Sequence, residues 1–183
     1  MQQATLSVQT KTITVQDTVG PTITVTPDTI TLEAGSPSPD LLDGVTTDDG
    51  STVTTTGSVD TSTPGTYVIT YNSVDAQGNA AAPVTRTYII QDTTDPVLTV
   101  PADVTLEFPA DTTPANTGFA TATDNALPAP TVTFSDVSVP GTGNIIEVIT
   151  RTWTATDATG NSVSADQTIT VQDTVGPTIH SYT

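Results

Sequence analysis

The sequence contains no cysteine, which excludes disulfide bonds, thiolate metal sites and thiol catalysis. Basic residues are scarce as well: 3 Lys or Arg stand against 20 Asp or Glu, so the formal net charge is -17. Nucleic acids and anionic lipid surfaces are bound through clustered cations. No run of about 18 apolar residues is present either, as a membrane span would need. We therefore expect no nucleic-acid partner and no insertion into a membrane.

Aromatic residues make up only 4% of the chain, whereas Thr is the commonest residue with 44 of 183 positions. Thr and Val are β-branched and suit a pleated sheet better than a helix. No long stretch shows the 3.6-residue apolar period of a helix, so an all-β fold with essentially no helix is predicted. The expected strands are residues 22–25, 52–56, 66–71, 85–90, 97–100, 104–106, 131–134, 145–156 and 167–171.

Internal repetition is the strongest pattern in the sequence. Residues 13–23 read ITVQDTVGPTI and return unchanged as residues 169–179, with a shorter middle copy at residues 89–97. The equivalent glutamines of the three copies, at positions 16, 91 and 172, are 75 and 81 residues apart. That length matches a small β-sandwich rather than a solenoid repeat.

This period divides the chain into two complete domains and two partial ones. We call residues 19–93 repeat 1 and residues 94–174 repeat 2. Residues 1–18 are expected to be the last strand of a preceding domain, or an orphan strand donated to another molecule. Residues 175–183 are expected to begin a following domain.

Several sequence motifs in repeat 2 resemble the hyalin repeat, an immunoglobulin-like module of secreted and surface proteins. These motifs are Asp95-Pro96, PADVTLE at residues 101–107, ATDN at 122–125, TVTFS at 131–135 and WTATDATGN at 153–161. Many hyalin repeats carry a cysteine pair that is absent here. Repeat 1 is similar to a bacterial immunoglobulin-like domain through GTYVITY at residues 65–71 and DAQGN at 75–79. The resemblance implies two tandem immunoglobulin-like sandwiches in an extracellular stalk.

Acidic residues fall at particular places of such a sandwich. The linker, the B–C loop and the F–G loop meet at the entry end of each domain, and the first strand of the preceding domain ends near the same linker. Hard oxygen ligands from these places suit Ca²⁺, which takes 6 to 8 oxygens. The candidate ligands are Glu33, Asp92, Asp95, Asp124, Asn125, Asp157 and Asn161 at the junction of the repeats, and Asp17, Asp48 and Asp75 at the entry of repeat 1.

The arrangement is similar to that of cadherins, in which calcium stiffens each junction. It departs from cadherins because the linker lacks their dense Asp-Asn run and their Asp-x-Asp ligand pair has no clear match. Plain turn chemistry is the open alternative, since an Asp side chain beside Gly or Asn commonly bonds the local backbone.

Catalysis finds little support. The only histidine is His180, and the adjacent pair Asp48-Asp49 is more typical of a solvated loop than of a glycosidase. Not being an enzyme is therefore the expectation. Three functions stay open: an extracellular spacer of a bacterial cell-surface adhesin, a filament subunit joined by β-strand donation, and a loop-based ligand-binding module. The expected partners are neighbouring copies of the same domain type, and the expected location is the cell surface.

Overall fold

The structure is a computed structural model and describes residues 1–4 and 8–178. His180 and the last part of residues 175–183 lie outside the described residues. The elements, in chain order, are β1 (Ile23–Val25), β2 (Thr29–Glu33), β3 (Val45–Thr47), β4 (Val53–Thr56), β5 (Gly65–Ser73), β6 (Val84–Gln91), β7 (Val97–Thr99), β8 (Val104–Glu107), α1 (Pro114–Thr117), β9 (Thr121–Thr123), β10 (Thr131–Pro140), β11 (Ile145–Thr156) and β12 (Ser162–Gln172). The predicted all-β fold is confirmed.

The one described helix, α1, is a single turn of four residues. Pro114 begins it, and proline is tolerated there because the first helical N–H has no partner within the helix. The Gly118 amide donates to the Pro114 carbonyl at 2.9 Å, and Gly118 has a positive φ of 99°, which ends the turn. This turn leaves the prediction of essentially no helix intact.

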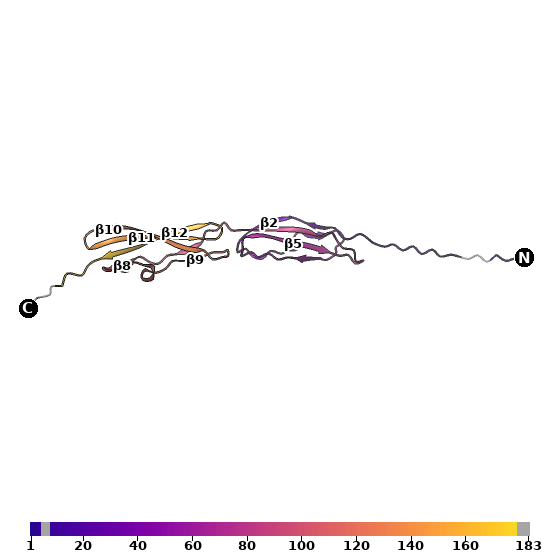
Figure 1. Cartoon of the computed structure of the whole chain (residues 1–183). Helices are drawn as coiled ribbons and strands as arrows, with labels where there is room; N and C mark the ends of the chain where they lie inside the picture. The colour runs from indigo at the N-terminus through magenta and orange to yellow at the C-terminus, as the bar shows by residue number, and fades with distance from the viewer. Residues whose placement is uncertain (5–7, 179–183) are drawn as a thin grey trace, which may run out of the picture. The chain divides into compact units, whose positions relative to one another are not determined.

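The strands form two large and two small sheets in the described residues. One four-stranded sheet has the order β2-β6-β5-β4 and the other β10-β11-β12-β8, while β1 pairs with β3 and β7 with β9. The strands β10, β11 and β12 form antiparallel neighbours, and β8 lies parallel to β12 with Val104 opposite Ile169. Figure 1 shows β10, β11 and β12 running side by side in the C-terminal part of the chain.

The last strand of each repeat is flanked by two others and buries alternate side chains. In β6 the residues Tyr88 and Ile90 are 0% and 2% exposed, and in β12 their equivalents Ile169 and Val171 are also 0% and 2% exposed. Side chains two residues apart in a strand point to the same face. The buried β-branched and aromatic residues of β6 and β12 therefore fill the core of a sandwich.

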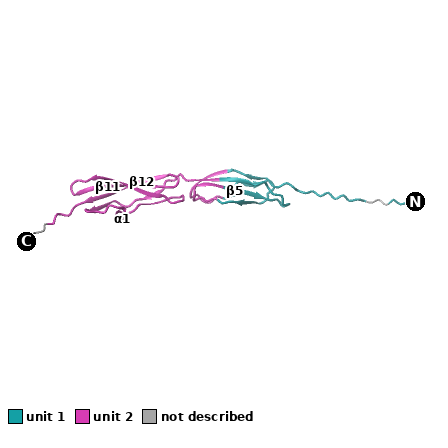
Figure 2. Cartoon of the chain, viewed as in Figure 1, with its two compact units in different colours: residues 1–28, 40–58, 68–87 teal, residues 29–39, 59–67, 88–183 magenta. Residues whose placement is uncertain are grey.

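The chain divides into two compact units, coloured separately in Figure 2. Unit 1 comprises residues 1–28, 40–58 and 68–87, and unit 2 comprises residues 29–39, 59–67 and 88–183. Strands β5 and β6 each begin in one unit and end in the other. The predicted domain boundary at residues 93/94 stays a prediction. The helix α1 is far too short and polar to cross a membrane, and no other helix occurs in the described residues.

The described residues before β1 form no strand. Within this segment Ile13 and Val15 are 78% and 93% exposed. No partner strand lies beside this segment among the described residues, and its expected role as the last strand of a preceding domain or as a donated strand stays a prediction.

Candidate metal site

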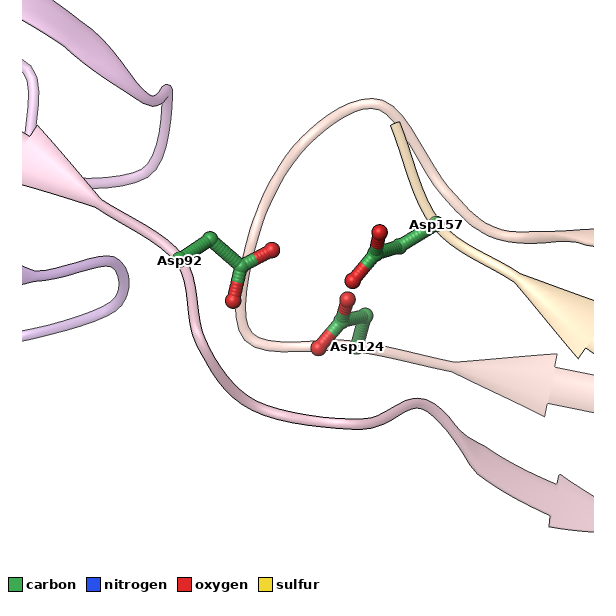
Figure 3. Close-up of side chains that lie close together, drawn as sticks. All are labelled: Asp92, Asp124 and Asp157. Carbon is green, nitrogen blue, oxygen red and sulfur yellow. The ribbon is translucent and has the colours of Figure 1, made fainter. Parts of the chain in front are cut away.

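Three aspartates converge in unit 2 from three separate segments. Asp92 directly follows β6, Asp124 directly follows β9, and Asp157 directly follows β11. One carboxylate oxygen of each lies within 4.8 Å of the corresponding oxygens of the other two. Figure 3 shows the carboxylates of Asp124 and Asp157 facing one another, with Asp92 turned toward them from the neighbouring segment. Asp92 and Asp157 are only 8% and 9% exposed.

Asp157 organises the turn between β11 and β12. Its Oδ1 accepts hydrogen bonds from the amides of Thr159, Gly160 and Asn161 at 2.9, 2.7 and 2.9 Å, and its Oδ2 accepts one from Asn161 Nδ2 at 2.9 Å. Burial alone raises the pKa of Asp157, but these hydrogen bonds outweigh burial and lower it to about 2. Asp157 is therefore a fixed anion throughout the physiological range.

Asp124 is the member of the cluster whose carboxylate lacks hydrogen-bond donors. Its Oδ1 accepts a hydrogen bond from the Asn125 amide at 2.7 Å, whereas its Oδ2 is buried and has no hydrogen-bond partner. Burial raises the pKa of Asp124, and the charges of Asp92 and Asp157 raise it further. A buried polar atom without a partner is uncommon, and a bound ion, ligand or water at this position would satisfy it.

Thr159 and Asn161 tie Asp92 to Asp157. The Thr159 hydroxyl lies 3.1 Å from Asp92 Oδ2 and 3.0 Å from Asp157 Oδ1. Asn161 Nδ2 donates to the Asp92 carbonyl at 3.3 Å. Sequence reasoning did not single out Thr159, because the equivalent position of repeat 1 is Gln77 and a Thr in a Thr-rich chain carries no signal.

The geometry suits one divalent cation. Oxygens bound to a single Ca²⁺ lie about 2.4 Å from the ion, so no two of them can be much more than about 4.8 Å apart. The three carboxylates meet this limit. Arg151 pairs with Asp136 outside the cluster, and the three carboxylates accept hydrogen bonds from neutral amide and hydroxyl donors. Asp92, Asp124 and Asp157 would hold the metal.

The other ligands predicted at this junction are used differently. The Glu33 carboxylate accepts hydrogen bonds from the Thr93 amide at 2.6 Å and the Thr94 hydroxyl at 3.1 Å. The Thr93 amide is the largest cause of a lowered pKa of Glu33. Asn125 Nδ2 donates to the Ala34 carbonyl at 2.7 Å, and Asp95 is exposed. Glu33 and Asn125 therefore fix the backbone around the cluster.

At the entry of repeat 1 the turn asparagine makes the same hydrogen bonds, but the described residues form no carboxylate cluster there. Asn79 Nδ2 donates to Asp75 Oδ2 at 2.8 Å and to the Asp17 carbonyl at 3.3 Å, as Asn161 does with Asp157 and Asp92. Asp48, however, accepts the Thr22 amide at 2.8 Å, which is the main cause of its lowered pKa. For Asp48 and Asp75, turn and backbone hydrogen bonding is the role that the structure shows.

Comparison with known proteins agrees with these repeats. Residues 22–90 match the family model described as the Ig-like domain of bacterial surface proteins. The chain is 33% identical over 186 residues to hyalin of Strongylocentrotus purpuratus and 34% identical over 179 residues to hyalin of Lytechinus variegatus. These alignments cover 93% and 90% of this chain but only 15% and 33% of the two hyalins.

Among solved structures, the chain is similar to Drosophila N-cadherin EC1-3, with 16% identity, a TM-score of 0.34, and coverage of 85% of this chain and 68% of that one. It is also similar to human protocadherin-24 EC1-2, with 13% identity, a TM-score of 0.38, and coverage of 86% and 100%.

The sequence matches support an extracellular module of the adhesion type. The chain is built of immunoglobulin-like, hyalin-like repeats, and its residues 22–90 match the immunoglobulin-like family of bacterial surface proteins.

Proposed function

We propose that this chain is a spacer of an extracellular surface protein and that Ca²⁺ bound by Asp92, Asp124 and Asp157 stiffens it. Its role is mechanical and positional rather than catalytic, and its partners are neighbouring repeats of the same type. The observation that carries the metal part is the buried, unpartnered Oδ2 of Asp124 beside two further carboxylates. A carboxylate in this setting is stabilised by a divalent cation, which removes both the repulsion and the missing bond.

The segment around the cluster also favours stiffness. Within unit 2, Ala34, Ile90 and Ala126 form a buried apolar cluster. The Leu127 amide donates to the Ser62 carbonyl at 2.8 Å. These contacts lie directly beside Asp124, so a cation there would add to a segment that is already packed. A spacer benefits from such packing because a stiff segment keeps its two ends at a fixed separation.

The decisive experiment is a calcium titration of the full chain, followed by thermal unfolding and by calorimetry. At a free Ca²⁺ concentration 100 times the dissociation constant, binding to the folded state adds about 2.7 kcal/mol. The unfolding temperature should therefore rise by several degrees, and EDTA should reverse the rise.

Two matched variants test the site. Asp124→Asn should abolish the calcium response, because it removes the carboxylate with the unpartnered oxygen. Asp95→Asn should leave the response unchanged, because Asp95 is an exposed aspartate of the same linker outside the cluster. Equal loss in both variants would contradict this site, and a wild-type chain that ignores calcium would remove the metal while leaving the spacer.

A further inference from the structure

The two repeats carry an aspartate at the same position of the loops that follow β3 and β9. A shift of 75 residues along the chain preserves the strand register, because two residue pairs between β1 and β3 become two pairs between β7 and β9. The pairs are Ile23 with Thr47 and Thr24 with Thr46 in repeat 1, and Leu98 with Ala122 and Thr99 with Thr121 in repeat 2. The same shift makes Asp49 equivalent to Asp124, and Ser51 equivalent to Ala126.

In repeat 1 the carboxylate at this position is satisfied by its own loop. Asp49 Oδ1 accepts a hydrogen bond from the Ser51 amide at 2.8 Å, and Asp49 Oδ2 accepts one from the Ser51 hydroxyl at 2.6 Å. An aspartate commonly bonds the residue two positions further on in this way. Both oxygens of Asp49 therefore have a donor, and the carboxylate needs no cation.

In repeat 2 the equivalent loop leaves one oxygen of the carboxylate without a donor. Asp124 Oδ1 accepts the Asn125 amide at 2.7 Å, whereas Asp124 Oδ2 is buried and has no partner. Ala126 stands where repeat 1 has Ser51, and its methyl side chain cannot donate a hydrogen bond. Ala126 is only 5% exposed and belongs to the buried apolar cluster of unit 2. Burial thus favours a small apolar residue at the position from which a hydroxyl would close the carboxylate.

The neighbours of Ala126 direct donors to main-chain carbonyls. Asn125 Nδ2 donates to the Ala34 carbonyl at 2.7 Å, and the Leu127 amide donates to the Ser62 carbonyl at 2.8 Å. These hydrogen bonds hold the loop on both sides of Ala126. A residue at position 126 is therefore fixed beside the carboxylate, and its side chain decides whether the last oxygen receives a donor.

We propose that Ala126 is a specificity-determining residue of the cation site. Because it has no side-chain donor, it leaves Asp124 open to a divalent cation, whereas Ser51 closes the equivalent Asp49. A hydroxyl proton and a cation compete for the lone pairs of the same carboxylate oxygen. The inference rests on the proposed function, and it names the residue that selects which of two equivalent loops binds the metal.

Calcium calorimetry on two variants of the full chain tests this role. Ala126→Ser introduces the hydroxyl of repeat 1, and Ala126→Cys, kept reduced, introduces a side chain of similar size whose S–H is a weak donor. The serine variant should bind calcium about tenfold more weakly than the wild type, since a hydrogen bond to a charged group must be given up. The cysteine variant should bind close to the wild-type value. Equal affinities of the two variants, beside a wild type that binds calcium, would overturn this inference alone.

Thermal unfolding separates the hydrogen bond from a packing defect. In EDTA the serine variant should unfold at a higher temperature than the cysteine variant, because the hydroxyl satisfies the buried Asp124 oxygen. In saturating calcium the cysteine variant should be the more stable one. A packing defect would rank the two variants alike with and without calcium, and that result would overturn the role of Ala126. A wild type without any calcium response would overturn the proposed metal site and this inference together.

Discussion

Asp124 and Asp157 are neighbouring carboxylates whose surroundings differ in one respect. Hydrogen bonds from the Asn161 side chain, Thr159 and two turn amides outweigh burial and lower the pKa of Asp157 to about 2. Asp124 receives one amide hydrogen bond, so burial and the adjacent charges dominate and raise its pKa. The number of donors around a buried carboxylate therefore decides whether it is a stabilising anion or a group that needs a cation.

This difference predicts how stability depends on pH in the absence of metal. A lowered pKa means that Asp157 contributes stability above the ordinary aspartate value of about 4. That contribution is lost as the pH falls from about 4 toward about 2, through the pKa of Asp157 in the folded protein. Urea unfolding in EDTA should show this loss in the wild type. In Asp157→Asn it should be missing, and an unchanged acid limb in that variant would contradict the assignment.

For Asp124 we expect the opposite dependence of stability on pH. Because its pKa is raised, its favourable state is the protonated one, and that contribution disappears as the pH rises through the raised pKa. In EDTA at pH 7, Asp124→Asn should therefore unfold at a higher temperature than the wild type. With calcium the order should reverse, because only the wild type gains the cation. Differential scanning calorimetry with and without calcium measures both orders, and the same order under both conditions would argue against metal binding.

At the scale of the elements, the hairpin of β10 and β11 is held by a charged centre. Arg151 is 2% exposed and donates to both Asp136 oxygens at 2.8 Å, to Thr117 Oγ1 at 2.8 Å and to the Thr112 carbonyl at 2.9 Å. Its guanidinium also lies 4.6 Å from the centre of the Phe134 ring. One side chain thus joins the hairpin to the segment around α1.

Removing this side chain should be costly. Arg151→Met leaves the Asp136 carboxylate and the Thr112 carbonyl without their donor, and we expect a loss of about 2–4 kcal/mol in the free energy of unfolding. Asp136 is 34% exposed, so water recovers part of the loss. The double variant with Asp136→Leu should regain stability, because the unpaired charge is gone. Urea unfolding followed by Trp153 fluorescence measures both, and a double variant that is less stable than the single one would contradict this account.

The predicted strand bounds agree with the observed ones where β-branched residues are dense. Residues 145–156 were predicted as a strand and form β11 with these bounds. Residues 131–134 were predicted, whereas β10 continues to Pro140. The extension contains Asp136 and two serines, which carry no strand signal, and it pairs along β11 all the same. The strands β2, β3 and β9 were not in the predicted set. Strands β3 and β9 span three residues each and contain a single apolar residue, which is too few for a visible period.

At the scale of the whole molecule, the net charge of -17 has two consequences. It keeps the chain soluble through mutual repulsion, and it attracts divalent cations to places where carboxylates gather. In unit 2, three carboxylates gather beside the segment that leads from β6 to β7. If a cation stiffens the proposed spacer, calcium should therefore change the range of conformations of the whole chain.

Small-angle X-ray scattering tests this response. Calcium should narrow the distribution of interatomic distances of the full chain in solution, and EDTA should broaden it. Asp124→Asn should give the broad distribution under both conditions, while Asp95→Asn should behave as the wild type. A distribution that calcium leaves unchanged in the wild type would separate the spacer role from any role of the metal.

The sequence by itself determined the fold class and the repetition, because β-branched composition, alternation and repeated words are local properties of the chain. It also located ten candidate ligands, but not which of them meet. Only the tertiary structure decided that Asp92, Asp124 and Asp157 converge. It also decided that Glu33 accepts hydrogen bonds from Thr93 and Thr94, and that Asp48 accepts one from Thr22. The physical reason is that each carboxylate binds the nearest donor its fold supplies, and those donors come from segments distant in sequence.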